Sequence, residues 1–159
     1  MISLRPVSTD DFNLIFEWEN IPELWKVSEQ QGPFSREEIE SFISNCLDVN
    51  NTEIERWIVC NSSMPIGAID IFEYDLLNQN CGIGIFISNY TNRNKGYAGA
   101  ALAQAVSMLQ ARGCLLIRAI IYTDNTSSRR LFLSAGFQEG ATTPYKGKSA
   151  LHFFWTPRA

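Results

Sequence analysis

Residues 93–102, RNKGYAGAAL, join an apolar run to a segment with helical periodicity. The apolar run, Cys81–Ser88, predicts a strand, and the spacing of the later apolar residues predicts a helix over Ala98–Arg112, ended by Gly113. The N–H groups in the first turn of such a helix have no partner within it, and the helix dipole adds partial positive charge. The segment is therefore either an anion-binding turn suited to a diphosphate or a plain strand-to-helix loop that needs Gly96 for its conformation.

A second segment, DNTSSRRLFLSAGF at residues 124–137, repeats this arrangement. It follows Leu115–Tyr122, whose nearly continuous apolar character predicts a strand buried on both faces. Asn125 is a typical helix N-cap, and Gly136 ends the helix. Two successive strand–turn–helix units place both helix N-termini at the same edge of a sheet, where ligands tend to bind. Neither turn has the spacing of GxGxxG or GxxxxGKS/T, which excludes those two nucleotide-binding motifs.

The other segments extend this pattern to the whole chain. Ser8–Asp11 and Ser35–Glu38 are capping sequences that precede helices. The further strands are expected at Ile2–Leu4, Arg56–Cys60, Pro65–Glu73, Phe137–Thr143 and Leu151–Thr156. The order β-α-α-β-β-β-α-β-α-β-β requires a right-handed crossover with a parallel pair, and its hairpins make the other pairs antiparallel. We therefore expect an α/β (α+β) fold, a mixed sheet with helices on both faces, in a single domain over residues 1–159.

The composition favours a globular protein and argues against several functional classes. Of the 159 residues 45% are hydrophobic, and the net charge of −4 argues against a surface built for nucleic acid or anionic membrane. No apolar run approaches the ~18 residues of a membrane-spanning helix, and the N-terminus lacks the apolar core of a signal peptide. The four cysteines are widely separated and the chain has one histidine, so no metal site is expected, and free buried thiols fit a reducing cytoplasm.

Together, the two turns resemble those of the GNAT superfamily of N-acetyltransferases. RNKGYA is similar to the acyl-CoA signature (R/Q)xxGx(G/A), and NTSSRRLFLSAGF is similar to the downstream segment NxxSxxL(Y/F)xxxGF. The opening LRPVSTDDFNLIFEWEN resembles the RimJ/RimL and spermidine acetyltransferase branch. The resemblance covers the whole chain and implies a mostly antiparallel sheet of about seven strands, with a splayed parallel pair and about four flanking helices.

The resemblance also implies a site for the co-substrate acetyl-CoA. Its pyrophosphate would contact the N–H groups of the glycine turn, and its pantetheine arm would pair with the backbone of the preceding strand. The residues implied in that strand and turn are Phe86, Ile87, Ser88, Arg93, Asn94, Lys95, Gly96, Tyr97 and Ala98. Asn125 would bind the pantetheine side, and Ser128, Arg129 and Arg130 would lie near the CoA tail. The side chains of Arg93 and Lys95 are either phosphate ligands or ordinary solvated charges.

Acetyl transfer from a thioester to an amine needs a neutral nitrogen, donors for the oxyanion and a proton for the leaving thiolate. The main-chain N–H near Ile87 is the expected oxyanion donor. Asp70 is the best candidate for a base or an amine-orienting carboxylate, although a carboxylate satisfied by the backbone explains it equally well. Glu29 and Glu73 are weaker alternatives, and a water chain or a substrate that arrives deprotonated also stays open.

Phe132 occupies the position at which many relatives carry a tyrosine as general acid. Tyr122, Tyr90 and Tyr97 are candidates to replace it, although each is also readily explained as a packing or surface residue. Cys81 is not expected to be a covalent nucleophile, because no histidine is near it in sequence and direct transfer is typical of the family.

The sequence leaves the acceptor open. The resemblance makes residues 18–34 the acceptor-lining region, where Trp18, Trp25, Glu29 and Phe34 would suit a cationic amine unless the tryptophans simply close the core. We expect an N-acetyltransferase that acts on a small amine, a polyamine or a protein N-terminus. The alternatives are a non-catalytic acyl-CoA-binding module and a structural or interaction protein that kept the fold. Strand exchange or edge pairing in relatives also leaves a homodimer open.

Overall fold

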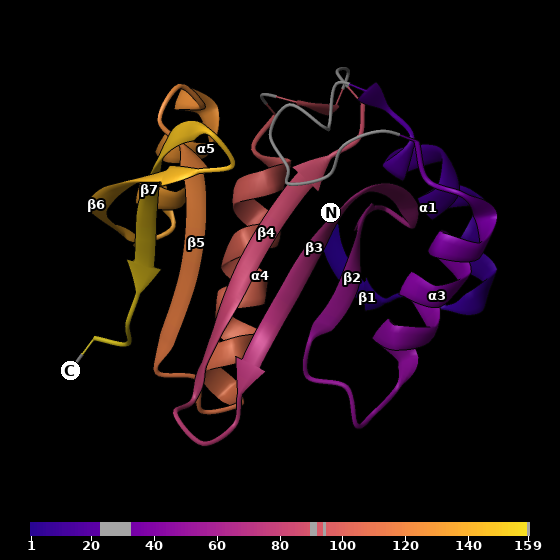
Figure 1. Cartoon of the computed structure of the whole chain (residues 1–159), viewed down its shortest axis with the longest axis horizontal. Coiled ribbons are helices and arrows are strands. Elements are labelled where there is room, and N and C mark those ends of the chain that lie inside the picture. Colours follow the sequence, from indigo (N-terminus) through magenta and orange to yellow (C-terminus); the bar gives the residue numbers. More distant parts are fainter. Residues whose placement is uncertain (23–32, 90–91, 94, 159) are drawn as a thin grey trace.

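The computed structural model describes residues 1–22, 33–89, 92–93 and 95–158. Within these ranges, seven strands form one sheet, with helices on both of its faces (Figure 1). The strands are β1 (Ile2–Pro6), β2 (Ile54–Asn61), β3 (Met64–Asp75), β4 (Asn80–Ile87), β5 (Leu116–Tyr122), β6 (Gln138–Tyr145) and β7 (Lys148–Trp155). The helices are the 3₁₀ helix η1 (Thr9–Asp11), α1 (Phe12–Glu19), α3 (Arg36–Leu47), α4 (Tyr97–Ala111) and α5 (Thr126–Ser134).

The strand order across the sheet is β1-β2-β3-β4-β5-β7-β6. Neighbouring strands are antiparallel throughout this sheet, apart from the parallel pair β4–β5 that α4 connects. The predicted element order and the mixed, mostly antiparallel sheet are therefore confirmed.

Short capping sequences fix where the first helices begin. Ser35 accepts a hydrogen bond from the Glu38 N–H at 3.1 Å, and the Glu38 carboxylate accepts one from the Ser35 N–H at 3.1 Å. Ser8 and Asp11 form the same reciprocal pair at the start of η1, which runs directly into α1. Each pair satisfies backbone donors that the helix itself leaves without partners. Both capping predictions are confirmed.

The sheet separates two hydrophobic clusters. One face packs against α4 and α5, through residues that include Leu102, Leu109, Phe132, Ile69 and Ile83. The other packs against α1 and α3, through residues that include Ile15, Trp18, Ile43, Ile58 and Ala68. We call these the α4 face and the α1 face. Because side chains alternate along a strand, Asp70, Gly84 and Phe86 lie on the α1 face together with Ala68.

The last hairpin is longer than the sequence predicted. Pairing continues to Tyr145 and Lys148, because Lys146 and Gly147 form a two-residue turn with φ values of 51° and 79°. None of the helices in the described ranges is long and apolar enough to span a membrane.

Candidate active site

The parallel strands β4 and β5 stay paired over only a short length. Asn80–Gly82 lie in register with Leu116–Arg118, and beyond them the strands diverge toward the edge where β4 ends (Figure 1). We call this unpaired region the splay. Beyond Gly82, none of the described strands pairs with the main-chain groups on that side of β4.

The direction of the main-chain groups decides which residues of β4 can offer hydrogen bonds to a ligand in the splay. Both the N–H and the hydroxyl of Ser88 donate to the Ile66 carbonyl of β3, at 2.8 and 3.0 Å. Main-chain groups alternate in direction along a strand, so those of Phe86 also face β3, whereas those of Ile85 and Ile87 face the splay. Of the three residues expected to bind the pantetheine arm, only Ile87 offers its N–H there. The N–H group of Ile85, which was not among the expected residues, also faces the splay. The N–H groups of Phe86 and Ser88 face β3 instead.

The glycine turn lies at the edge toward which the splay opens. Gly96 is the N-cap of α4 with φ of 80°, and a Cβ added to it would meet no described atom within 4 Å. Tyr97 and Ala98, both half-buried, begin the helix, where N–H groups lack intrahelical acceptors. Lys95 is exposed, and Asn94 lies outside the described residues. The guanidinium of Arg93 donates to the Ile87 carbonyl at 3.3 Å, so its side chain braces the end of β4.

The start of α5 lies at the same edge of the sheet. The Asn125 side chain accepts a hydrogen bond from the Ser128 N–H at 3.2 Å and thereby caps the helix. Arg129 is held by Glu139 at 2.8 Å and by the Thr123 carbonyl at 3.0 Å, whereas Arg130 is exposed.

These two helix starts suit an anionic ligand. Their N–H groups and dipoles carry partial positive charge, and the described residues 95–100 and 125–130 add basic side chains and no carboxylate. The carboxylate of Asp124, just before α5, lies 3.6 Å from the Lys148 ammonium. The residues present therefore fit the diphosphate of a nucleotide-like ligand such as coenzyme A.

Asp70 belongs to an ionic cluster built around the buried Arg56 side chain. Its two carboxylate oxygens accept hydrogen bonds from Nε and Nη2 of Arg56, at 2.7 and 2.8 Å. Arg56 also donates to Glu19 at 2.7 Å, from a side chain only 3% exposed. The Asp70 and Glu19 side chains are 25% and 14% exposed. Among the described residues, one guanidinium thus faces two carboxylates.

Aromatic rings complete this cluster, which we call the Arg56 cluster (Arg56, Asp70 and Glu19). The Arg56 guanidinium carbon lies 4.6 Å from the centre of the Phe42 ring and 5.3 Å from that of Phe86. The Phe86 ring in turn meets Trp18 edge to face at 5.5 Å. Trp18 is buried and closes the core, which favours the structural interpretation of this tryptophan.

The other candidate catalytic and acceptor-lining residues have different environments. Tyr122 is buried on β5, with its ring 6.2 Å from that of Tyr145 and 4.5 Å from the Lys148 ammonium. Tyr97 packs against the core of the α4 face. Glu73, with a side chain 67% exposed, lies 3.7 Å from Arg118. Tyr90, Trp25 and Glu29 lie outside the described residues.

Two side chains are placed by packing. Phe132 is buried against Phe137 and Phe153, with ring centres 4.9 and 6.4 Å away, so the position of the family tyrosine belongs to the core. Cys81 is buried beside Cys114, with the sulfur atoms 3.8 Å apart, and burial raises the pKa of its thiol to about 12. Such a thiol is a poor nucleophile at neutral pH.

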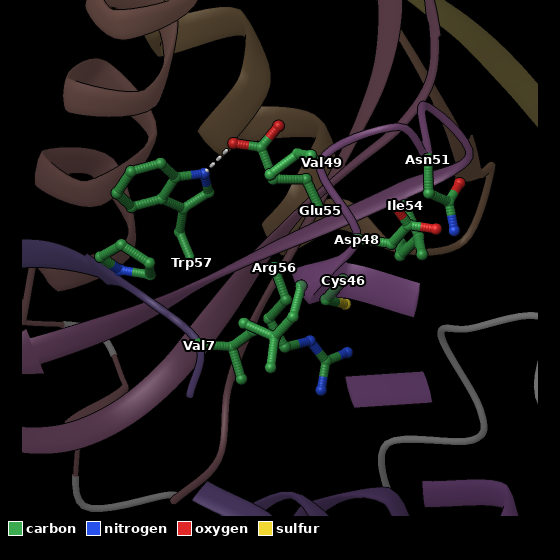
Figure 2. Close-up of a pocket in the computed structure, with 11 residues that line it drawn as sticks. Val7, Cys46, Asp48, Val49, Asn51, Ile54, Glu55, Arg56 and Trp57 are labelled. Carbon is green, nitrogen blue, oxygen red and sulfur yellow. Dashed lines mark hydrogen bonds between the residues drawn. The ribbon is translucent and has the colours of Figure 1, made fainter. Parts of the chain in front are cut away.

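Two hollows lie away from the splay. One, of about 440 Å³, is lined by Glu19, Phe34, Glu37, Glu38, Ile39, Ser41, Phe42 and Asn45. The other, of about 220 Å³, lies beside the start of β2 and the end of α3 (Figure 2). There Trp57 points away from Arg56, and its indole N–H donates to Glu55 at 2.6 Å (Figure 2). Neither hollow is lined by the glycine turn, the start of α5 or β4.

Sequence reasoning missed Arg56, Glu19 and Ile85. The sequence offered one indication of this cluster, because Arg56 begins the apolar run RWIVC and an arginine in a buried strand needs a carboxylate partner. Within the described residues, no group of three or more histidine, cysteine or acidic side chains is arranged to hold a metal ion.

The comparisons with known proteins agree with this geometry. A family model described as acetyltransferase (GNAT) domain matches residues 2–138. No curated protein matches the sequence. The fold is similar to spermidine N-acetyltransferase from Vibrio cholerae in complex with CoA and spermine, with a TM-score of 0.88, 16% identity and coverage of 98% of this chain and 95% of that one.

Two further solved structures share the fold. Aminoglycoside acetyltransferase AAC(6')-Ib in complex with coenzyme A and kanamycin has a TM-score of 0.82 at 17% identity, over 98% of this chain and 95% of that one. The alpha-N-protein acetyltransferase RimL in complex with coenzyme A has a TM-score of 0.86 at 14% identity, over 98% and 93%. Together with the splay and the glycine turn, the family match over most of the sequence leads to one conclusion: the chain belongs to the GNAT family of acetyltransferases.

Proposed function

We propose that this protein transfers an acetyl group directly from acetyl-CoA to a primary amine. The observation that carries the proposal is the short pairing of β4 with β5, which opens toward the αL glycine turn and two helix N-termini. The free edge of β4 supports an extended pantetheine arm by strand addition, through Ile85 and Ile87. The residues assigned to the diphosphate are Arg93, Lys95, Gly96, Tyr97, Ala98, Ser128 and Arg130, with Asn125 at the helix cap and Asn94 kept as a sequence-based assignment.

The chemistry follows from these positions. The amine lone pair attacks the thioester carbonyl, the C–S bond breaks, the nitrogen loses a proton and the thiolate gains one. The Ile87 N–H is the donor assigned to the developing oxyanion, and Arg93 holds the end of that strand through the Ile87 carbonyl. Much of the acceleration is assigned to positioning of the two reactants.

Proton transfer is assigned to residues on the α1 face. Asp70 is proposed to orient the amine and to accept its proton, with Arg56 fixing the carboxylate. Tyr122, on β5 across the splay from β4, remains the proposed proton donor to the thiolate.

The acceptor is proposed to be a small amine, a polyamine or a protein N-terminus. The two half-buried carboxylates beside Arg56 support an acceptor that carries positive charge. The spermine and kanamycin complexes among similar structures, and the alpha-N-protein activity of RimL, supply one example of each class.

Two measurements test the proposal. Calorimetry with acetyl-CoA comes first, and absence of binding at millimolar concentration contradicts it. Release of CoA thiol and product masses are then followed with 1,4-diaminobutane, spermidine, kanamycin and a tetrapeptide with a free α-amine. Binding of acetyl-CoA without acetylation of any of these favours a non-catalytic acyl-CoA-binding module. Absence of both favours a structural or interaction protein.

A further inference from the structure

Gly84 has no structural reason to be a glycine among the described residues. A Cβ added there meets none of their atoms within 4 Å, and its φ lies outside the left-handed region. The register of β3 with β4 is continuous through this position, so no bulge accounts for it. Glycine in the interior of a strand lowers stability, and close approach of a ligand is one of its established causes.

Two other strand glycines provide the contrast. A Cβ on Gly82 would collide with the ring of Phe72, and one on Gly67 would collide with the Phe86 carbonyl of the neighbouring strand. Packing therefore accounts for both. Gly84 differs from them because no described atom lies within 4 Å of its side-chain position.

The residues around Gly84 indicate which part of a substrate fits beside it. Gly84 lies on β4 two residues beyond Gly82, where pairing with β5 stops. Asp70 is its direct cross-strand partner on the α1 face, and Phe86 is the next residue of β4 on that face. Side chains at such cross-strand positions lie next to each other. A carboxylate fixed by buried Arg56 and an aromatic ring thus flank a position beside the splay that no described atom fills.

We infer that Gly84 is a specificity-determining residue, whose missing side chain makes room for the carbon that carries the reacting nitrogen of the amine acceptor. Asp70 faces that nitrogen from the neighbouring strand. The inference rests on the proposed acetyl transfer and deepens it, because it assigns to one residue the limit on acceptor bulk. Acetyl-CoA, on the main-chain edge of β4, does not depend on the side chain at this position.

Gly84→Ala and Gly84→Val test the inference with the best acceptor that the wild-type protein acetylates in the panel above. A methyl or isopropyl group fills the open position, and loss of fit by one carbon corresponds to a fall on the order of 10-fold in kcat/KM for the acceptor. The fall is larger for Gly84→Val than for Gly84→Ala. The dissociation constant of acetyl-CoA stays within about twofold and the melting temperature does not fall, because neither side chain needs to displace the fold. Ser3→Val, which adds similar bulk at an exposed position of the outer strand β1, is the matched control and keeps wild-type kinetics.

Each outcome has one meaning. Wild-type kcat/KM in both Gly84 variants overturns the inference and leaves the proposed acetyl transfer intact. A parallel loss of acetyl-CoA affinity also overturns it, because the position would then serve the co-substrate. Absence of acetylation by the wild-type protein with every amine overturns the proposed function and this inference with it.

Discussion

At the scale of single residues, the carboxylate of Asp11 ties the first strand to the first helix. Arg5 donates to both of its oxygens at 2.8 Å, and the Ser8 N–H donates at 2.8 Å. These hydrogen bonds hold the pKa of Asp11 below its ordinary value of 3.8, so the stabilisation is present above that value and is lost as the pH falls through the lowered pKa. We predict that Asp11→Asn lowers the free energy of unfolding by about 1–3 kcal/mol at pH 7 and by less at a pH below the lowered pKa of Asp11. Urea unfolding of both proteins at the two pH values measures this, with the exposed Asp10→Asn as control, and an equal loss at both contradicts it.

The ion pair of Asp70 shows why some contacts at this scale escape the sequence. The turn at Ser62 and Ser63 sets Asn61 opposite Met64, a register that would place Arg56 opposite Ile69, on the wrong face for Asp70. A β-bulge between Val59 and Cys60 shifts the register by one residue and brings Arg56 opposite Asp70. Hydrophobic periodicity does not indicate a bulge. The sequence therefore contains Arg56 and Asp70 without showing that they pair.

At the scale of elements, the glycines at the two ends of α4 distinguish a conformational requirement for glycine from a role in ligand binding. Gly96 and Gly113 flank this helix with φ values of 80° and 88°, a region in which alanine is strained. We predict that Gly96→Ala and Gly113→Ala each lower the free energy of unfolding by about 1–2 kcal/mol. Only Gly96→Ala should weaken acetyl-CoA binding, because Gly113 lies at the other end of the helix. Calorimetry measures the acetyl-CoA affinity of both variants. Equal affinities contradict the assignment of the glycine turn to acetyl-CoA binding.

The helices and the order of elements could be predicted because their determinants are local. The Ser35–Glu38 capping box and the Asn125 cap lie within four residues of the helix that each begins, and the structure contains both. The splay itself followed only from the resemblance to a family, since no local pattern says where two parallel strands stop pairing. The directions of the main-chain groups of β4 needed the pairing with Ile66, which is distant in sequence.

At the scale of the whole molecule, Arg56 connects helices and strands that are far apart in the sequence. It lies in β2 and binds Asp70 of β3 and Glu19 of α1, which are 14 and 37 residues away, and it stacks on Phe42 of α3. The proposed acetyl-CoA site consists of two local motifs that can be read in the sequence, whereas the proposed acceptor site depends on these long-range contacts. Removing the guanidinium takes the Arg56 ion pair from both carboxylates between the helices and the sheet.

We therefore predict that Arg56→Met lowers the free energy of unfolding by about 3–5 kcal/mol, because two half-buried carboxylates lose a buried guanidinium partner. Arg112→Met is the matched control: its ion pair with Glu55 has side chains 36% and 33% exposed, and its loss should cost about 0–1 kcal/mol. Adding Glu19→Gln and Asp70→Asn to Arg56→Met should recover part of the lost stability, since the repelling carboxylates are then neutral. Urea unfolding measures all of these variants. A loss in Arg56→Met no larger than in Arg112→Met would contradict this prediction and would mean that the two carboxylates are solvated in the variant.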